Sequence, residues 1–123
     1  MEISEVDFIT VPTTDIARAE AFYGEVLGLP VRARWGRMPA VEFQAGQLTL
    51  AVMEMEAFGQ EFRRSSTAVA LRVADVAEAR AELEGKGIAF RGDTIDSGVC
   101  HQAHFGDPDG NPLILHHRYA PQG

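Results

Sequence analysis

The stretch VPTTDIARAE at residues 11–20 returns in outline as LRVADVAEAR at residues 71–80. Asp15 and Asp75 take the same place in the two copies, and alanines follow both aspartates at the same two offsets. An internal repeat of about half the chain indicates two copies of one supersecondary unit. The sequence therefore predicts a duplicated fold, with one module in each half.

Each copy begins with the pattern of a strand followed by a helix. Short apolar runs at 8–11 and 69–73 predict the first strand of each module. Asp15 and Asp75 then stand where a helix N-cap accepts hydrogen bonds from the first free amides. Apolar residues recur at helical spacing after both aspartates, and glycines are placed to end both helices.

Three further strands are expected in each half. They are 31–35, 40–44 and 47–53 in the first half, and 88–91, 99–105 and 112–117 in the second. The expected fold class is α+β, with two tandem βαβββ modules that form one curved, cup-shaped mixed sheet with the helices outside. We expect a single domain over 1–123, divided into a module at about 1–55, a linker at about 56–66 and a module at about 67–123.

Composition narrows the class of protein. A chain of 123 residues with 46% apolar and 24% charged residues is large enough to bury a core, which argues against disorder. The net charge of −7 would repel a phosphate backbone, so we expect no nucleic-acid partner. No apolar run reaches the roughly 20 residues that a membrane span needs. The acidic start and the single cysteine, Cys100, expected as a buried thiol, favour the cytoplasm.

Several short motifs follow one another along the two halves of the chain. The first half contains DI at 15–16, AFY at 21–23 and VLGL at 26–29. The second half contains VADV at 73–76, GI at 87–88 and FGDPDGN at 105–111. Together with the duplication, these motifs resemble the vicinal oxygen chelate superfamily. That superfamily includes glyoxalase I, bleomycin-resistance proteins, extradiol dioxygenases and fosfomycin-resistance enzymes.

The resemblance implies where a metal site would lie. Metal-dependent members hold a divalent ion through His, Glu or Gln at four strand positions, which fall here on Phe8, Thr49, Ala68 and Ile114. Three of these side chains have no lone pair, and a threonine hydroxyl is a poor substitute for a carboxylate. We therefore expect no metal and no cofactor. The loss is typical of the bleomycin-binding branch, which sequesters a ligand instead of transforming it.

Strand alternation then predicts which residues line the cup. A tight turn at Ala45-Gly46 would place Glu42 opposite Thr49. A four-residue turn at 107–110 would place His101 opposite His116 and Ala103 opposite Ile114, and leave His104 and His117 on the outer face. A register error of one residue would reverse these last assignments. The predicted ligand-binding residues are Phe8, Thr10, Trp35, Glu42, Thr49, Ala51, Ala68, Ala70, His101, Ala103, Ile114 and His116.

Three functions follow from this reading. The first is a metal-free small-molecule-binding protein, which sequesters an unidentified ligand in the cup. The second is an enzyme of lyase, isomerase or dioxygenase type, in which Glu42, His101 and His116 form a divergent acid–base or metal site. The third is a structural or regulatory module whose cup is closed by Phe8 and Ile114. A homodimer is expected in each case, because an open curved sheet leaves apolar surface and strand edges uncovered.

Overall fold

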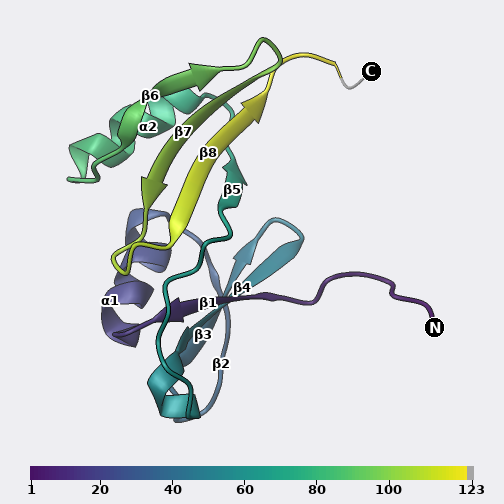
Figure 1. Ribbon diagram of the computed structural model, residues 1–123, viewed down its shortest axis with the longest axis vertical. Helices are drawn as coiled ribbons and strands as arrows, with labels where there is room; N and C mark the ends of the chain where they lie inside the picture. Colours follow the sequence, from purple (N-terminus) through teal and green to yellow (C-terminus); the bar gives the residue numbers. More distant parts are fainter. Residues whose placement is uncertain (122–123) are drawn as a thin grey trace. The chain divides into compact units, whose positions relative to one another are not determined.

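The structure is a computed structural model that describes residues 1–121 (Figure 1). Its internal contacts divide the chain into two compact units, Met1–Ser65 and the residues from Ser66 onward. We call these unit 1 and unit 2 and describe each by itself. No helix in the described part of the chain is long and apolar enough to cross a membrane.

Unit 1 contains a four-stranded sheet and a helical segment. Its elements are β1 (Ile9–Thr13), α1 (Ile16–Glu20), η1 (Ala21–Val26), β2 (Val31–Arg34), β3 (Ala40–Ala45), β4 (Leu48–Glu54) and η2 (Met55–Phe58). The strand order is β1-β4-β3-β2, with β1 parallel to β4 and the other pairs antiparallel. This is one βαβββ module, as the sequence predicts.

Unit 2 repeats this topology. Its elements are β5 (Val69–Arg72), α2 (Val76–Gly85), β6 (Arg91–Asp96), β7 (Cys100–Gly106) and β8 (Pro112–Arg118). The strand order is β5-β8-β7-β6, and again only the first pair is parallel. The α+β class with two modules is therefore confirmed. The strands pair within two separate four-stranded sheets, whereas we had expected one sheet.

Both predicted N-caps are present. Asp15 Oδ1 accepts a hydrogen bond from the Arg18 amide at 3.2 Å, and Asp75 Oδ1 accepts one from the Glu78 amide at 2.9 Å. Each bond satisfies an amide that has no partner within the first helical turn. The aspartates that reveal the repeat thus start both helices.

The helical segment of unit 1 changes type after Glu20. Residues 21–26 form a π-helix, in which the Leu27 amide donates to the Phe22 carbonyl, five residues earlier, at 2.9 Å. Within this segment the neighbouring aromatic side chains Phe22 and Tyr23 are both buried. The segment ends before Gly28, whose φ of 74° lies in the left-handed region that favours glycine.

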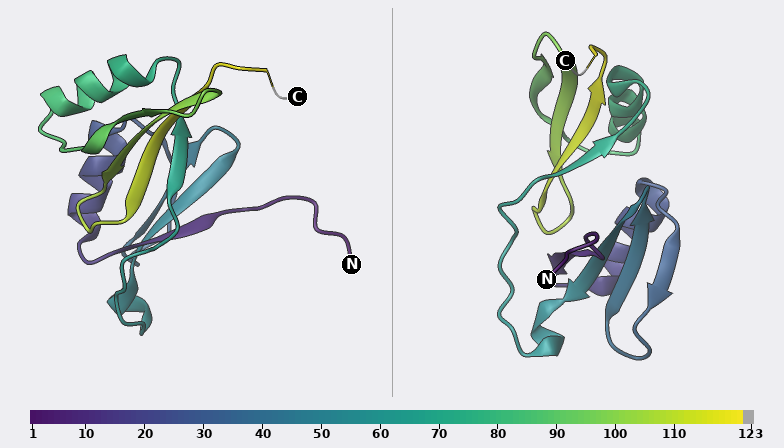
Figure 2. Two further views of the ribbon diagram at one scale, coloured as in Figure 1. Left: turned by 45° about the horizontal axis from the view of Figure 1, so that its top comes forward. Right: turned by 90° about the vertical axis from the view of Figure 1, so that its right-hand side faces the viewer.

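Each helix covers one face of its own sheet (Figure 2). The buried side chains between them form the core of each unit. In unit 1 the core includes Val11, Ala19, Phe22, Tyr23, Val41, Phe43, Leu50 and Val52. In unit 2 it includes Val76, Leu83, Ala103, Phe105, Leu113 and Leu115. The opposite face of each sheet carries no helix of its own unit, and we call it the helix-free face.

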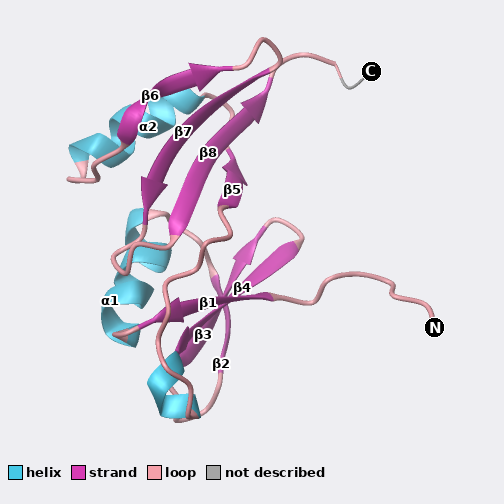
Figure 3. Ribbon diagram, viewed as in Figure 1, coloured by secondary structure: helices cyan, strands magenta, loops and turns pink. Residues whose placement is uncertain are grey.

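Two predicted segments differ from the structure (Figure 3). The strand expected at 88–91 lies further along, at β6, because the Ile88 amide still bonds to the Leu83 carbonyl and Phe90 packs on Phe105. The expected linker overlaps the short 3-10 helix η2 (Met55–Phe58), which Gly59 caps. The division between units falls at Ser65, near the end of that linker.

The β3–β4 hairpin turns one residue later than predicted. Gly46 and Gln47 form the turn, with Gly46 at a φ of 63°. Glu42 therefore lies opposite Ala51, and Gln44 lies opposite Thr49. The expected pairing of Glu42 with Thr49 is wrong by two residues, a shift that keeps both side chains on the same face.

The predicted β7–β8 register is wrong by one residue. This error has a larger effect than the error in the β3–β4 pairing. Five residues, 107–111, connect these strands, because Asn111 bonds to Asp107 through its backbone amide (2.9 Å to Oδ1) and carbonyl (3.0 Å to the Asp107 amide). His101 lies opposite His117 and Ala103 opposite Leu115, so the predicted pairs with His116 and Ile114 are wrong. A shift of one residue moves every side chain of β7 to the other face.

Candidate functional site

The helix-free face of unit 1 gathers the lining residues predicted for the first half. Thr10, Ala51 and Glu42 lie side by side on β1, β4 and β3. Phe8 precedes Thr10 by two positions, and Thr49 precedes Ala51 by two, so both belong to the same face. Thr49 and Ala51 are buried, whereas Phe8 and Thr10 are exposed.

Three aromatic rings form a cluster on this face. The Trp35 ring contacts the Phe8 ring edge-on, with centroids 6.4 Å apart, and the Phe58 ring edge-on at 6.0 Å. We call these three residues the aromatic cluster. Phe8 remains 46% exposed, so the cluster offers an aromatic surface to solvent. The sequence does not identify Phe58 as a site residue, because Phe58 lies in the expected linker. The one signal that could have found it is an aromatic residue in a polar stretch.

Glu42 holds the indole of Trp35 in place. Its Oε2 accepts a hydrogen bond from Trp35 Nε1 at 2.7 Å, and its Oε1 accepts one from Arg32 Nη1 at 3.0 Å. The Glu42 side chain is only 15% exposed. Both oxygens are thus occupied and the charge is paired, which suits a positioning role better than proton transfer. Arg32 was not predicted from the sequence, although it stands on the strand beside Glu42.

The side-chain amide of Gln44 lies next to Thr49, which is opposite it in the sheet. Thr49 Oγ1 donates to Gln44 Oε1 at 3.3 Å, and Gln44 Nε2 donates to the Gly46 carbonyl at 2.6 Å. The threonine hydroxyl therefore belongs to a network that braces the β3–β4 hairpin.

The four positions at which the resemblance implies metal ligands do not fit a divalent ion here. Phe8 and Thr49 lie on the helix-free face of unit 1, and Ala68 and Ile114 on that of unit 2. Phenyl, methyl and butyl side chains have no donor atom, and the Thr49 hydroxyl is bonded to Gln44. Among residues 1–121, no three His, Cys, Asp or Glu side chains are grouped to hold a metal ion. No step of any reaction can be assigned to a metal at these positions.

The helix-free face of unit 2 is polar along two rows. Arg72, His116 and Gln102 lie side by side on β5, β8 and β7. The next row consists of Ala70, Ile114 and His104. His104 Nε2 lies 3.2 Å from Gln102 Oε1. His104, expected on the outer face, is thus on the same face as Ile114 and His116.

His101 and Ala103 do not share this face, which corrects their predicted role. Ala103 is fully buried in the core under α2, opposite Leu115. His101 lies opposite His117, and its Nε2 is 3.4 Å from Asp96 Oδ2. His101 and His116 therefore point to opposite faces of one sheet, and the predicted convergence of these two histidines is wrong.

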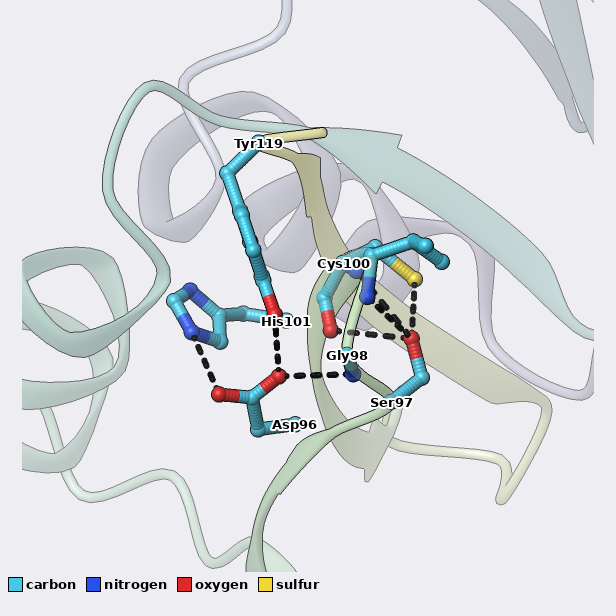
Figure 4. Close-up of polar contacts among 7 residues, drawn as sticks. Asp96, Ser97, Gly98, Cys100, His101 and Tyr119 are labelled. Atoms are coloured by element: carbon cyan, nitrogen blue, oxygen red, sulfur yellow. Dashed lines mark hydrogen bonds and ion pairs between the residues drawn. The ribbon is translucent and has the colours of Figure 1, made fainter. Parts of the chain in front are cut away.

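His101 belongs instead to a surface cluster with Asp96 and Tyr119 (Figure 4). The Tyr119 hydroxyl donates to Asp96 Oδ1 at 2.7 Å, and its ring stacks on His101 with centroids 4.8 Å apart. The bond from Tyr119, helped by the Gly98 amide, lowers the pKa of Asp96, and the same carboxylate raises the pKa of Tyr119. The contact is therefore intact at neutral pH. It is lost below the lowered pKa of Asp96 or above the raised pKa of Tyr119.

The Cys100 thiol beside this cluster is buried, as expected. Its sulfur lies 3.2 Å from Ser97 Oγ and 3.7 Å from Gln102 Nε2. These contacts pack the end of β7 and do not present the sulfur to solvent.

Comparison with known proteins shows which family this chain resembles in sequence and fold. Residues 5–115 match the model of the Glyoxalase/Bleomycin resistance protein/Dioxygenase superfamily, whereas no curated protein matches the chain. The antibiotic binding protein TnmS3 from Streptomyces sp. CB03234 is 28% identical, with 96% of this chain and 98% of that chain covered and a TM-score of 0.78. Lactoylglutathione lyase from Agrobacterium tumefaciens shares the fold at 18% identity, with 94% of both chains covered and a TM-score of 0.78. With 111 of its 123 residues matched by the family model, the chain belongs to the Glyoxalase/Bleomycin resistance protein/Dioxygenase superfamily.

Proposed function

We propose that this chain is a metal-free small-molecule-binding protein that sequesters a ligand against its helix-free faces. The observation that carries the proposal is the aromatic cluster, in which Glu42 fixes the Trp35 indole and Phe8 stays exposed. A fixed indole offers a large contact area without a further loss of side-chain entropy on binding. The ligand class that suits this surface is an aromatic small molecule.

Two further observations support binding over catalysis. The four family metal positions carry Phe8, Thr49, Ala68 and Ile114, whose donor chemistry does not suit a divalent ion. TnmS3, a relative described as an antibiotic binding protein, resembles this chain over nearly its full length. The proposed lining in unit 1 is Phe8, Thr10, Trp35, Glu42, Thr49 and Ala51, and in unit 2 it is Ala68, Ala70, Ile114 and His116. The enzyme alternative has no comparable support, since Glu42 is paired with Arg32 and His101 faces away from His116.

A thermal-shift screen of aromatic small molecules tests this proposal. Ligands that bind should raise the melting temperature and change the protein's tryptophan fluorescence, which comes from Trp35 alone. The variant Phe8→Ala should bind such a ligand about tenfold more weakly, because it loses one aromatic contact and its buried area. The chelator EDTA should leave the affinity unchanged.

The variant Phe62→Ala provides the matched control, since it removes a phenyl group outside the aromatic cluster. It should bind the same ligand as tightly as the unaltered chain. The proposal fails if no compound shifts the melting temperature, or if bound compounds leave the fluorescence of Trp35 unchanged.

We also propose that the chain acts as a homodimer in the cytoplasm and has no nucleic-acid partner. Within the described residues, β1 and β2 are the edges of one sheet and β5 and β6 the edges of the other. Val31 on β2 and Ile95 on β6 are exposed apolar residues on these edges. Two-fold association is a common way to cover such edges. Light scattering at micromolar concentration should give about twice the 13.4 kDa chain mass, and a 13.4 kDa species would contradict the dimer.

A further inference from the structure

Charge is distributed unevenly over unit 2. All four histidines of the chain lie on the paired strands β7 and β8. Strands β5, β7 and β8 contain no aspartate or glutamate, although the whole chain carries a net charge of −7. Three adjacent strands of the unit 2 sheet therefore carry no acidic side chain, although the protein as a whole is acidic.

On the helix-free face, this bias produces a row of hydrogen-bond donors. Arg72, His116 and Gln102 occupy neighbouring positions across β5, β8 and β7. Adjacent strands lie about 4.8 Å apart, so the row spans about 10 Å. Arg72 is exposed and His116 half-buried. In the described part of the chain, neither side chain forms a hydrogen bond or an ion pair. We call these three residues the donor row.

Contacts with His104 and Cys100 orient the Gln102 amide of the donor row. An amide oxygen only accepts hydrogen bonds, so the 3.2 Å contact of Gln102 Oε1 with His104 means that His104 Nε2 donates. That bond turns the Gln102 amide nitrogen toward Cys100 and leaves it a second N–H. Ala70 and Ile114 lie beside the row and add an apolar surface next to the donors.

The only two carboxylates on the strands of this sheet, Asp93 and Asp96, are both on β6. Asp96 lies opposite His101, on the other face, and is bonded to Tyr119. Asp93 lies in the irregular part of β6 between Arg91 and Ile95, at the outer edge of the sheet. Arg91 itself lies opposite His104 and adds a further positive charge beside the row. The donor row thus has a cationic surrounding and no carboxylate partner on its own strands.

We propose that the donor row binds the oxyanion of a small molecule, either a carboxylate or a phosphate. A guanidinium matches such an anion with two parallel N–H bonds, while the imidazole and the amide supply further donors. Contacts at hydrogen-bond distance outweigh the net charge of the chain, because salt screens charges beyond about 8 Å. The inference rests on the proposed function, since it names the chemical class of small molecule that the helix-free face of unit 2 would bind.

Titrations with sodium phosphate and with sodium benzoate test this inference, with sodium chloride at equal ionic strength as the reference. Amide and imidazole NMR signals of Arg72, Gln102, His104 and His116 should shift and saturate with at least one of the two anions. Arg72→Gln should weaken that binding about tenfold, because it removes a charged pair. His116→Gln, which keeps an N–H donor, should weaken it less. A response to phosphate alone indicates a phosphate ligand, and a response to benzoate alone a carboxylate.

The variant Arg37→Gln is the matched control, because it removes an exposed arginine from the β2–β3 turn of unit 1. It should leave binding unchanged. The inference is overturned if neither anion gives a saturating shift up to about 50 mM, if chloride gives the same shifts, or if Arg37→Gln weakens binding as much as Arg72→Gln. The proposed function would survive that result, because its own test uses aromatic compounds and the signal of Trp35.

Discussion

Replacing Phe43 by alanine should lower the free energy of unfolding of unit 1 by about 3–5 kcal/mol. The Phe43 ring is fully buried, tilted against the Tyr23 ring at a centroid distance of 5.9 Å, and lies opposite Leu50 in the sheet. Its removal leaves a cavity between η1 and β3 that close packing does not refill. Urea unfolding followed by the fluorescence of Trp35, which reports on unit 1, measures the loss.

The variant Phe43→Leu is the control for this prediction. It keeps most of the apolar volume and should lose clearly less stability than Phe43→Ala. An alanine variant that unfolds within 1 kcal/mol of the unaltered chain would mean that Phe43 does not fill the core of unit 1.

Replacing Asp107 by alanine should destabilise unit 2 by about 3 kcal/mol. The buried carboxylate accepts three hydrogen bonds, from the amides of Asp109 and Asn111 at 2.9 Å each and from Asn111 Nδ2 at 2.7 Å. Without it, the buried Asn111 side chain loses this acceptor, and the loop that sets the β7–β8 register loses its closure. Circular dichroism during urea unfolding measures the change in stability.

The variant Asp107→Asn keeps one acceptor oxygen and should lose less stability than Asp107→Ala. Cross-strand NMR contacts between His104 and Ile114 report the register directly. Equal stability of Asp107→Ala and the unaltered chain would show that the loop is held by other contacts.

The architecture of each module could be predicted because its signals are local. Asp15 and Asp75 start their helices through bonds to amides three residues away, and the glycine after the first helix adopts the left-handed backbone that its position requires. Alternation of apolar residues then defines the strands. The π-helical form of 21–26 could not be predicted in this way, because it depends on the burial of Phe22 and Tyr23 in the core.

The facing of site residues could be predicted only where the turn length was nearly correct. Gly46 is the first residue of its turn, a position where glycine is favoured in two-residue hairpins. Using that preference would have corrected the β3–β4 register. The loop at 107–111 is closed by the Asp107 side chain, which accepts a hydrogen bond from the Asn111 backbone amide. Counting the residues typical of turns does not detect this bond and predicts a loop of four residues instead of five. For this reason His101 and Ala103 were assigned to the wrong face, and Gln102 and His104 were missed.

The π-helical segment of unit 1 has a consequence for how this chain can change length during divergence. A π-turn holds one residue more than an α-turn, so a deletion within 21–26 can be absorbed by conversion to an α-helix. The three strands that follow would then keep their pairing. The same deletion in a hairpin would exchange the two faces of a strand. Length variation among descendants of unit 1 should therefore accumulate in this helix, where it leaves the residues facing a ligand unchanged.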